Sequence, residues 1–144
     1  KAVKEANPKA VFGISPQGNI TNDWNMGADV ARWCSTSGYV DYICPQLYVN
    51  FEHPTLPYDG AAEEWRELVT SEEVDLYLGL AVYKAGSDSD EGTWKNSSDI
   101  LARQIELGRE LGCDGFMFYS WDYLMGGQAE EEVANAMKVL SGES

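Results

Sequence analysis

Four short runs of apolar and β-prone residues recur along the chain, and helical spacing follows each of them. The runs cover residues 11–15, 40–47, 76–83 and 115–121. Because they are apolar nearly throughout, they predict strands of a parallel sheet that is covered on both faces. Units of about 30 to 40 residues, each with a strand and then a helix, are typical of α/β domains.

Caps and apolar spacing predict the helices. Asn7-Pro8 ends a first helix, since the residue before a proline disfavours the α region. Asp59 is expected to cap the third helix, and Ser97 or Ser98 the fourth. The helices are expected at residues 1–6, 27–35, 60–69, about 98–111 and 130–140, and a loop at residues 19–25.

The central stretch, residues 40–50, begins as a strand and ends in groups that suit a ligand. Side chains alternate along a strand, so Gln46 and Tyr48 share one face, and Leu47 lies on the other. A Gln amide is poorly placed against an apolar helix layer, where it needs partners. We therefore expect Gln46 and Tyr48 to point toward an interior or a cleft at the carboxyl end of the strand, where α/β folds keep their sites.

The sheet is expected to belong to a barrel. No Gly-rich phosphate loop follows any predicted strand, which argues against an open nucleotide-binding sheet. A (β/α)8 barrel needs about 250 residues, whereas this chain has 144. The prediction is a single α/β domain of four consecutive β/α units, residues 1–144, forming the C-terminal half of a TIM-type barrel. The chain is accordingly expected to be part of a longer protein.

Composition narrows the classes of partner. The chain carries a formal net charge of −14 and a pI near 4.2, which argues against a nucleic-acid partner, since such binding rests on clustered Lys and Arg. No run is long enough to span a membrane. The three cysteines and the single His53 show no paired or metal-ligand spacing. We expect buried thiols, no metal and no cofactor.

Three segments in this order and spacing resemble the C-terminal half of the glycosyl hydrolase-like family 10 proteins. They are Phe12-Gly13-Ile14-Ser15-Pro16, then Val40-Asp41-Tyr42-Ile43 leading into Pro45-Gln46-Leu47-Tyr48, then Leu76-Tyr77-Leu78-Gly79 leading into Ala81-Val82-Tyr83-Lys84. The resemblance covers residues 3–124, and its Pro-Gln-x-Tyr element is the most specific part. It implies a bacterial barrel protein, extracellular or in the cell envelope, that acts on glycans.

The resemblance also implies that the main catalytic carboxylates lie upstream, since the family's Asp-Asp-Tyr element is not in this sequence. Segment 119–122 departs from the family and resembles, more distantly, the last strand of family-18 chitinases, whose Trp floors the sugar site. Asp122 is the carboxylate directly after a predicted strand end. It is a candidate acid, base or stabiliser, with a helix cap or loop role as the alternative.

The other site candidates are substrate-binding. Tyr83 and Lys84 sit at the end of the third predicted strand, although Lys84 could also be a solvated charge. Trp121 could stack on a pyranose ring or pack beneath loops. Asp41 stands at the beginning of its strand, the face of a barrel that serves stability, and is interpreted as structural. The acidic residues of segment 84–96 could hold calcium, but a flexible loop is the commoner outcome for such a segment.

Two functions fit these observations. One is a glycoside hydrolase-like barrel acting on polysaccharide such as peptidoglycan, with this half supplying substrate-binding strand ends. The other is a non-catalytic glycan-binding module. Four strands of a parallel barrel leave two open edges and an open apolar face, so the chain on its own is expected to form a homodimer.

Overall fold

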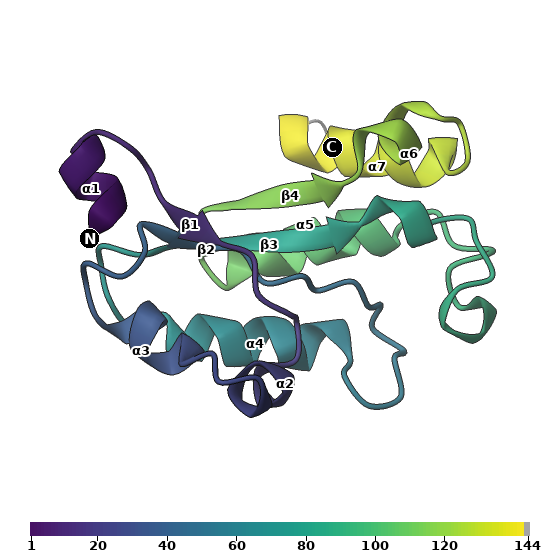
Figure 1. Ribbon diagram of the computed structural model, residues 1–144. Coiled ribbons are helices and arrows are strands. Elements are labelled where there is room, and N and C mark those ends of the chain that lie inside the picture. Colours follow the sequence, from purple (N-terminus) through teal and green to yellow (C-terminus); the bar gives the residue numbers. More distant parts are fainter. Residues whose placement is uncertain (143–144) are drawn as a thin grey trace.

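The chain folds around a four-stranded parallel sheet whose strands stand in sequence order, β1-β2-β3-β4. A computed structural model describes residues 1–142. The strands are β1 (Gly13–Ile14), β2 (Tyr42–Ile43), β3 (Asp75–Ala81) and β4 (Gly115–Tyr119). The α-helices are α1 (Ala2–Ala6), α2 (Ile20–Asn25), α3 (Val30–Ser35), α4 (Tyr58–Leu68), α5 (Ile100–Glu110), α6 (Trp121–Met125) and α7 (Glu130–Ser141). Strands and helices alternate, as predicted, and the arrangement is consistent with part of a (β/α) barrel (Figure 1).

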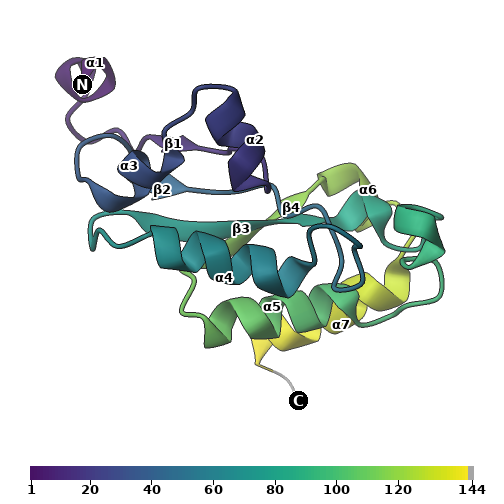
Figure 2. The same cartoon turned by 90° about the horizontal axis from the view of Figure 1, so that it is seen from below.

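Helices cover one face of the sheet. Leu76, Leu78 and Leu80 alternate along β3, and all three are fully buried on this side. A Cβ added to Gly108 of α5 would lie 3.2 Å from Leu78 Cδ1 and 2.5 Å from Phe116 Cε1, so α5 packs directly on β3 and β4. Figure 2 shows α4, α5 and α7 running along this side of the strands. The main hydrophobic core therefore lies between the sheet and these helices.

The opposite face carries aromatic and polar side chains, and we call it the open face. By register and alternation it holds Tyr42, Gln46, Tyr77, Met117 and Tyr119. The rings of Tyr42 and Tyr77 meet edge to face at 5.5 Å. Met117 and Tyr119 remain 45% and 55% exposed, so this chain by itself leaves that end of the face uncovered.

Two aspartates bind neighbouring strands together at the amino ends of the sheet. The Asp41 N–H donates to Phe12 O at 2.7 Å, and Asp41 Oδ2 accepts from the Phe12 N–H at 2.7 Å. Asp114 repeats this arrangement with Leu76, with both distances at 2.8 Å. Each carboxylate thus adds a second bond to a backbone pair just before its strand, which fits the structural role expected for Asp41.

Several predicted boundaries were wrong. Segment 19–25 is not a loop, because Asn19 caps α2 by accepting from the Asn22 N–H at 3.2 Å. β4 ends at Tyr119 instead of Trp121, and Trp121 begins the short helix α6. β3 ends at Ala81, and a 3₁₀ turn (Val82–Lys84) follows it. The regular part of β2 is also shorter than the predicted run, and only a bridge at Gln46 extends its pairing.

Two predicted caps were also wrong, for tertiary reasons. α4 begins at Tyr58 with Pro57 as its N-cap, so Asp59 lies inside the first turn. Tyr58 is fully buried, and its hydroxyl donates to Gln104 O at 3.2 Å, so packing favours the earlier start. At α5 the N-cap is Asp99, which makes no side-chain cap bond.

The cap of α5 comes from another helix. The buried carboxylate of Glu132, on α7, accepts from the Ile100 and Leu101 N–H groups at 3.0 Å each. Helix amino ends favour a negative charge that also satisfies their free N–H groups. Glu132 therefore ties α7 to α5 and fixes both against the sheet.

Candidate functional site

Gln46 lies at the carboxyl end of the sheet on the open face. It is bridged to Gln17 on one side and to Gly79 on the other, which extends the parallel pairing beyond β2. Its side chain is exposed, and Nε2 donates to Ser15 O at 3.2 Å and lies 3.4 Å from Ser15 Oγ. Those contacts hold the amide at the strand end, where it can still meet a ligand through its acceptor oxygen.

Tyr48 is seated by a glycine of the neighbouring strand. A Cβ on Gly79 would lie 3.4 Å from Tyr48 Cε1 and 2.9 Å from Pro45 O, so a side chain there would displace the ring or the backbone. The ring of Tyr48 stacks on Tyr119 with centroids 5.7 Å apart and planes at 27°. Burial raises the pKa of Tyr48 above its ordinary value, and Cys44, Tyr83 and Tyr119 add to that effect. Its phenol is therefore a neutral hydrogen-bonding group.

Tyr83 joins the same group from the 3₁₀ turn after β3. Its ring meets Tyr48 at 5.8 Å and Tyr119 at 6.0 Å, edge to face in both cases. Tyr123 of α6 follows at 6.1 Å from Tyr83. We call Tyr48, Tyr83, Tyr119 and Tyr123 the tyrosine cluster. It stands where the carboxyl ends of β2, β3 and β4 meet.

Sequence reasoning found two members of this cluster and missed two. Tyr119 was assigned to the interior of a longer strand, and Tyr123 fell in a segment for which no element was predicted. The available signal was alternation, since Tyr119 lies two residues after Met117 and must share its face. The aromatic spacing at residues 119, 121 and 123 was visible as well.

Lys84 is held by the loop that follows it. Its ammonium lies 2.8 Å from Asp90 Oδ1 and 3.0 Å from Oδ2, and both side chains are largely buried. Trp94, fully buried, donates from Nε1 to Asp90 Oδ2 at 2.8 Å. Lys84 therefore organises the segment from residue 84 to 96, and its contact with substrate stays a prediction.

Trp121 and Asp122 stand in the first turn of α6, directly after β4. Trp121 is 68% exposed and Asp122 is also exposed. The indole is thus accessible for stacking instead of packing beneath loops. Asp122 in a first helical turn also complements the helix dipole, so its catalytic role stays a prediction.

Two other carboxylates near the strand ends are occupied or buried. Asp90 is paired with Lys84. Asp23 of α2 is 4% exposed, and its Oδ1 accepts from the Gln17 N–H at 3.2 Å. Burial raises the pKa of Asp23, and the Gln17 hydrogen bond only partly offsets this. Neither group is arranged as a free nucleophile.

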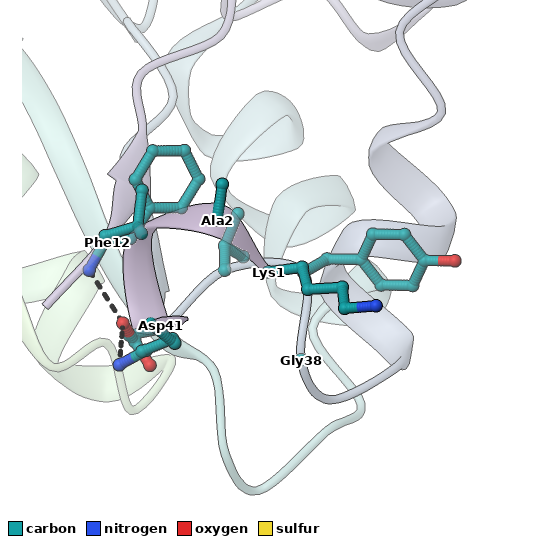
Figure 3. Close-up of a pocket in the computed structure, with 9 residues that line it drawn as sticks. Lys1, Ala2, Phe12, Gly38 and Asp41 are labelled. Carbon is teal, nitrogen blue, oxygen red and sulfur yellow. Dashed lines mark hydrogen bonds and ion pairs between the residues drawn. The ribbon is translucent and has the colours of Figure 1, made fainter. Parts of the chain in front are cut away.

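A pocket of about 220 Å³ lies at the other end of the sheet, beside α1. Figure 3 shows Asp41 on its wall, with a dashed line to the Phe12 N–H. Asp41 Oδ2 is also paired with the ammonium of Lys4. The Lys4 contact is 2.8 Å and, with the Phe12 bond, lowers the pKa of Asp41. The amino end of barrel strands serves stability, so we assign this pocket to the scaffold.

We next consider metal ligands, membrane-spanning helices and reactive cysteines in the part of the chain that the structure describes. Across residues 1–142, no group of three or more His, Cys, Asp or Glu side chains is arranged to hold a metal ion. None of the helices within that range is both long and apolar enough to cross a bilayer. Burial raises the pKa of Cys34, Cys44 and Cys113 to about 11, so these thiols are poor ligands and nucleophiles.

Comparison with known proteins identifies a family for the chain. The model of the Glycosyl hydrolase-like 10 family matches residues 1–96, two thirds of the chain. The chain belongs to the glycosyl hydrolase-like 10 family. This confirms the resemblance drawn from the Pro-Gln-x-Tyr element and its flanking strands. The match contains Gln46, Tyr48, Tyr83 and Lys84, whereas Trp121 and Asp122 lie beyond it.

Alignments with curated relatives extend the similarity beyond residue 96. The chain is 31% identical to Glycosyl hydrolase DigH of Escherichia coli O6:H1 over 152 aligned positions, covering 92% of this chain and 34% of that protein. It is 32% identical to Glycosyl hydrolase YngK of Bacillus subtilis over 127 positions, covering 77% of this chain and 24% of that protein. The chain therefore spans about a third or less of the length of the curated relatives it matches.

Proposed function

We propose that the chain forms the substrate-binding part of a glycoside hydrolase-like barrel acting on polysaccharide, with peptidoglycan among the candidate substrates. The observation that carries this proposal is the meeting of Gln46, Tyr48 and Tyr83 at the carboxyl ends of adjacent parallel strands. Barrel enzymes build their sites at that end. Trp121 adds an exposed indole just beyond β4, and membership of the glycosyl hydrolase-like family supports a glycan as the ligand.

The proposal assigns one catalytic carboxylate to this chain and the second to another part of the whole protein. Glycoside hydrolysis normally uses two carboxyl groups, about 5 Å apart for retention or roughly 6.5–9.5 Å apart for inversion. Asp122 follows a strand end and is exposed, whereas Asp90 is paired and Asp23 is buried. The proposal therefore gives Asp122 the part of acid, base or stabiliser and takes the second carboxylate from elsewhere in the whole protein.

The family resemblance supports an extracellular or cell-envelope location, where such glycans are found. A non-catalytic glycan-binding module is the second candidate. It is favoured by one observation, namely that Asp90 is paired with Lys84 and Asp23 is buried, so neither of these two carboxylates is free to act with Asp122. The two candidates differ in whether the bound glycan is cleaved.

The test is hydrolysis of purified peptidoglycan and plant polysaccharides by the full-length protein, followed as new reducing ends. We expect Gln46→Ala and Tyr48→Phe to lower turnover while the melting temperature changes by only a few degrees. Tyr39→Phe is the matched control, because Tyr39 is an exposed tyrosine at the amino end of the sheet. Unfolding by the Gln46 or Tyr48 change would show that these residues close the core instead of binding substrate.

The 144-residue chain by itself is expected to show no glycosidase activity. Robust turnover by this chain, abolished by Asp122→Asn, would overturn the assignment of the second carboxylate. Binding without cleavage by the full-length protein would establish the non-catalytic alternative.

A further inference from the structure

The tyrosine cluster differs in chemistry from the interior of a typical barrel. Interior layers of a barrel are normally filled by bulky aliphatic side chains. Here three rings pack mutually, one pair stacked and two pairs edge to face, at separations of 5.7 to 6.0 Å. Such a cluster is rigid, and its rings carry hydroxyl groups at their outer ends.

The four phenol hydroxyls have no partner within the described chain. Among residues 1–142, the tyrosine hydroxyl that makes a protein hydrogen bond is that of Tyr58, in the helical core. A polar group that is to be covered needs a hydrogen-bond partner. The surface that meets this cluster must therefore be partly polar, which a purely aliphatic barrel wall is not.

Tyr119 presents the most exposed ring of the cluster. It is 55% exposed even though Tyr48 stacks against it and Tyr83 meets it edge-on. Tyr83 is in turn fixed from behind, because Gln128 Nε2 donates to Tyr83 O at 3.0 Å and to Ala85 O at 2.8 Å. The platform is thus preorganised, which lowers the entropy lost when a ligand binds.

The cluster carries no free positive charge. Lys84 is the cation nearest to it in sequence, and Asp90 neutralises it at 2.8 Å. A ligand recognised here is recognised by apolar contact and by neutral hydrogen bonds. A pyranose ring with equatorial hydroxyls, such as glucose or N-acetylglucosamine, offers a C–H face for the ring and hydroxyls at its rim.

From these observations we infer that the tyrosine cluster is a sugar subsite in which one pyranose ring of the glycan stacks on Tyr119 while neighbouring phenols hydrogen-bond its hydroxyls. Besides offering their hydroxyls, Tyr48 and Tyr83 hold the Tyr119 ring in place. The exposed indole of Trp121, two residues on, offers a surface for the adjoining sugar. This inference rests on the proposed function and assigns Tyr119 and Tyr123, which the sequence did not single out.

The experiment measures binding of soluble chito- and cello-oligosaccharides to the full-length protein by isothermal titration, with hydrolysis assayed in parallel. Tyr119→Ala is expected to raise the dissociation constant about tenfold or more, equivalent to about 1.4 kcal/mol. Tyr119→Phe keeps the ring and is expected to stay within about threefold of the parent. Tyr39→Ala, at the far end of the sheet, is expected to change nothing.

Tyr119→Leu guards against a folding artefact, since it keeps an apolar side chain but removes the aromatic face. It is expected to lose affinity as Tyr119→Ala does, with an unchanged circular dichroism spectrum. If the Tyr119→Leu variant binds and cleaves glycan as well as the parent protein does, the subsite is refuted and the proposed function still stands. If the parent protein neither binds nor cleaves any glycan, both the subsite and the proposed function are refuted.

Discussion

Lys84 and Asp90 form a largely buried ion pair, with side chains 15% and 14% exposed and Nζ–O distances of 2.8 and 3.0 Å. Trp94 donates a further bond to the same carboxylate at 2.8 Å. One carboxylate therefore joins the residue after Tyr83 to the far end of an acidic loop. Because Lys84 directly follows Tyr83, the ion pair holds the folded loop next to the tyrosine cluster.

Asp90→Asn is expected to destabilise the protein in a pH-dependent way. Burial alone raises the pKa of Asp90, but hydrogen bonds from Lys84 and Trp94 outweigh it, so the folded-state pKa is lowered. A lowered pKa contributes stability above the ordinary Asp value of about 4 and loses it as pH falls through the folded value. The substitution should cost about 2 kcal/mol in urea unfolding near pH 7, with the difference shrinking below about pH 4.

Asp88→Asn is the matched control, because Asp88 pairs with Lys95 in the same loop with both side chains more than half exposed. Exposed pairs contribute about 0 to 1 kcal/mol, so its effect on stability should be small. Equal effects of the two substitutions would mean that the Lys84–Asp90 pair adds nothing specific.

Glu132→Gln is expected to lower stability because it removes the charge that caps α5 from α7. The carboxylate accepts two backbone N–H bonds at 3.0 Å and is 1% exposed, so an amide in its place loses one acceptor and the charge. We expect a loss of about 1–3 kcal/mol in urea unfolding. Glu131→Gln, exposed in the same helical turn, should stay within about 0.5 kcal/mol of the parent. Equal free energies of unfolding for the Glu132→Gln and Glu131→Gln variants would contradict the capping role of Glu132.

Gly86→Ala should cost clearly more than Gly92→Ala. Both glycines have positive φ, 73° and 82°, so alanine is strained at either site by about 1 kcal/mol. At Gly86 the added Cβ would also lie 2.6 Å from Gln128 O, whereas nothing lies within 4 Å at Gly92. We expect an additional loss of about 1–3 kcal/mol at Gly86, measured by thermal unfolding. Equal melting temperatures for the Gly86→Ala and Gly92→Ala variants would show that the segment carrying Gln128 moves aside at little cost in stability.

The arrangement of the fold could be predicted because local patterns decide it. Apolar runs at residues 40–47 and 76–83 marked buried parallel strands, and alternation placed Gln46 and Tyr48 on one face. Asn7-Pro8 ended α1 as expected. These features depend on residues close together in sequence.

What the sequence did not predict depends on contacts between distant segments. Glu132 caps α5 from 32 residues away, and no local motif indicates that. Asp90 was interpreted as part of a flexible acidic loop, because its partners Lys84 and Trp94 meet it only when the loop folds back. Tyr119 joined the site through stacking on Tyr48, 71 residues earlier by their numbers.

The last prediction concerns association of the 144-residue chain on its own. β1 and β4 are the two outer strands of the sheet, and both have an unpaired edge among the described residues. Such edges accept another strand. A two-fold axis parallel to the strands would place β4 of one copy beside β1 of the other and keep the pairing parallel, as in a closed barrel. Isologous pairing of this kind is the commonest form of closure.

The open face supplies the driving force. Met117 and Tyr119 leave much of their surface in water, and covering apolar area contributes roughly 25 cal/mol per Å². Charge opposes it, since two copies at −14 each carry −28 in total. We therefore expect a homodimer at micromolar concentration whose dissociation constant falls as salt screens that repulsion.

Sedimentation velocity at low and high salt is the measurement. Met117→Lys places a charge on the open face at the outer strand β4 and should give a monomer or a poorly soluble chain. Met137→Lys, on α7 and 38% exposed, is the control and should leave the dimer intact. A stable parent monomer at every salt concentration would mean that the chain covers its open face by itself, because exposed apolar surface of that extent favours association.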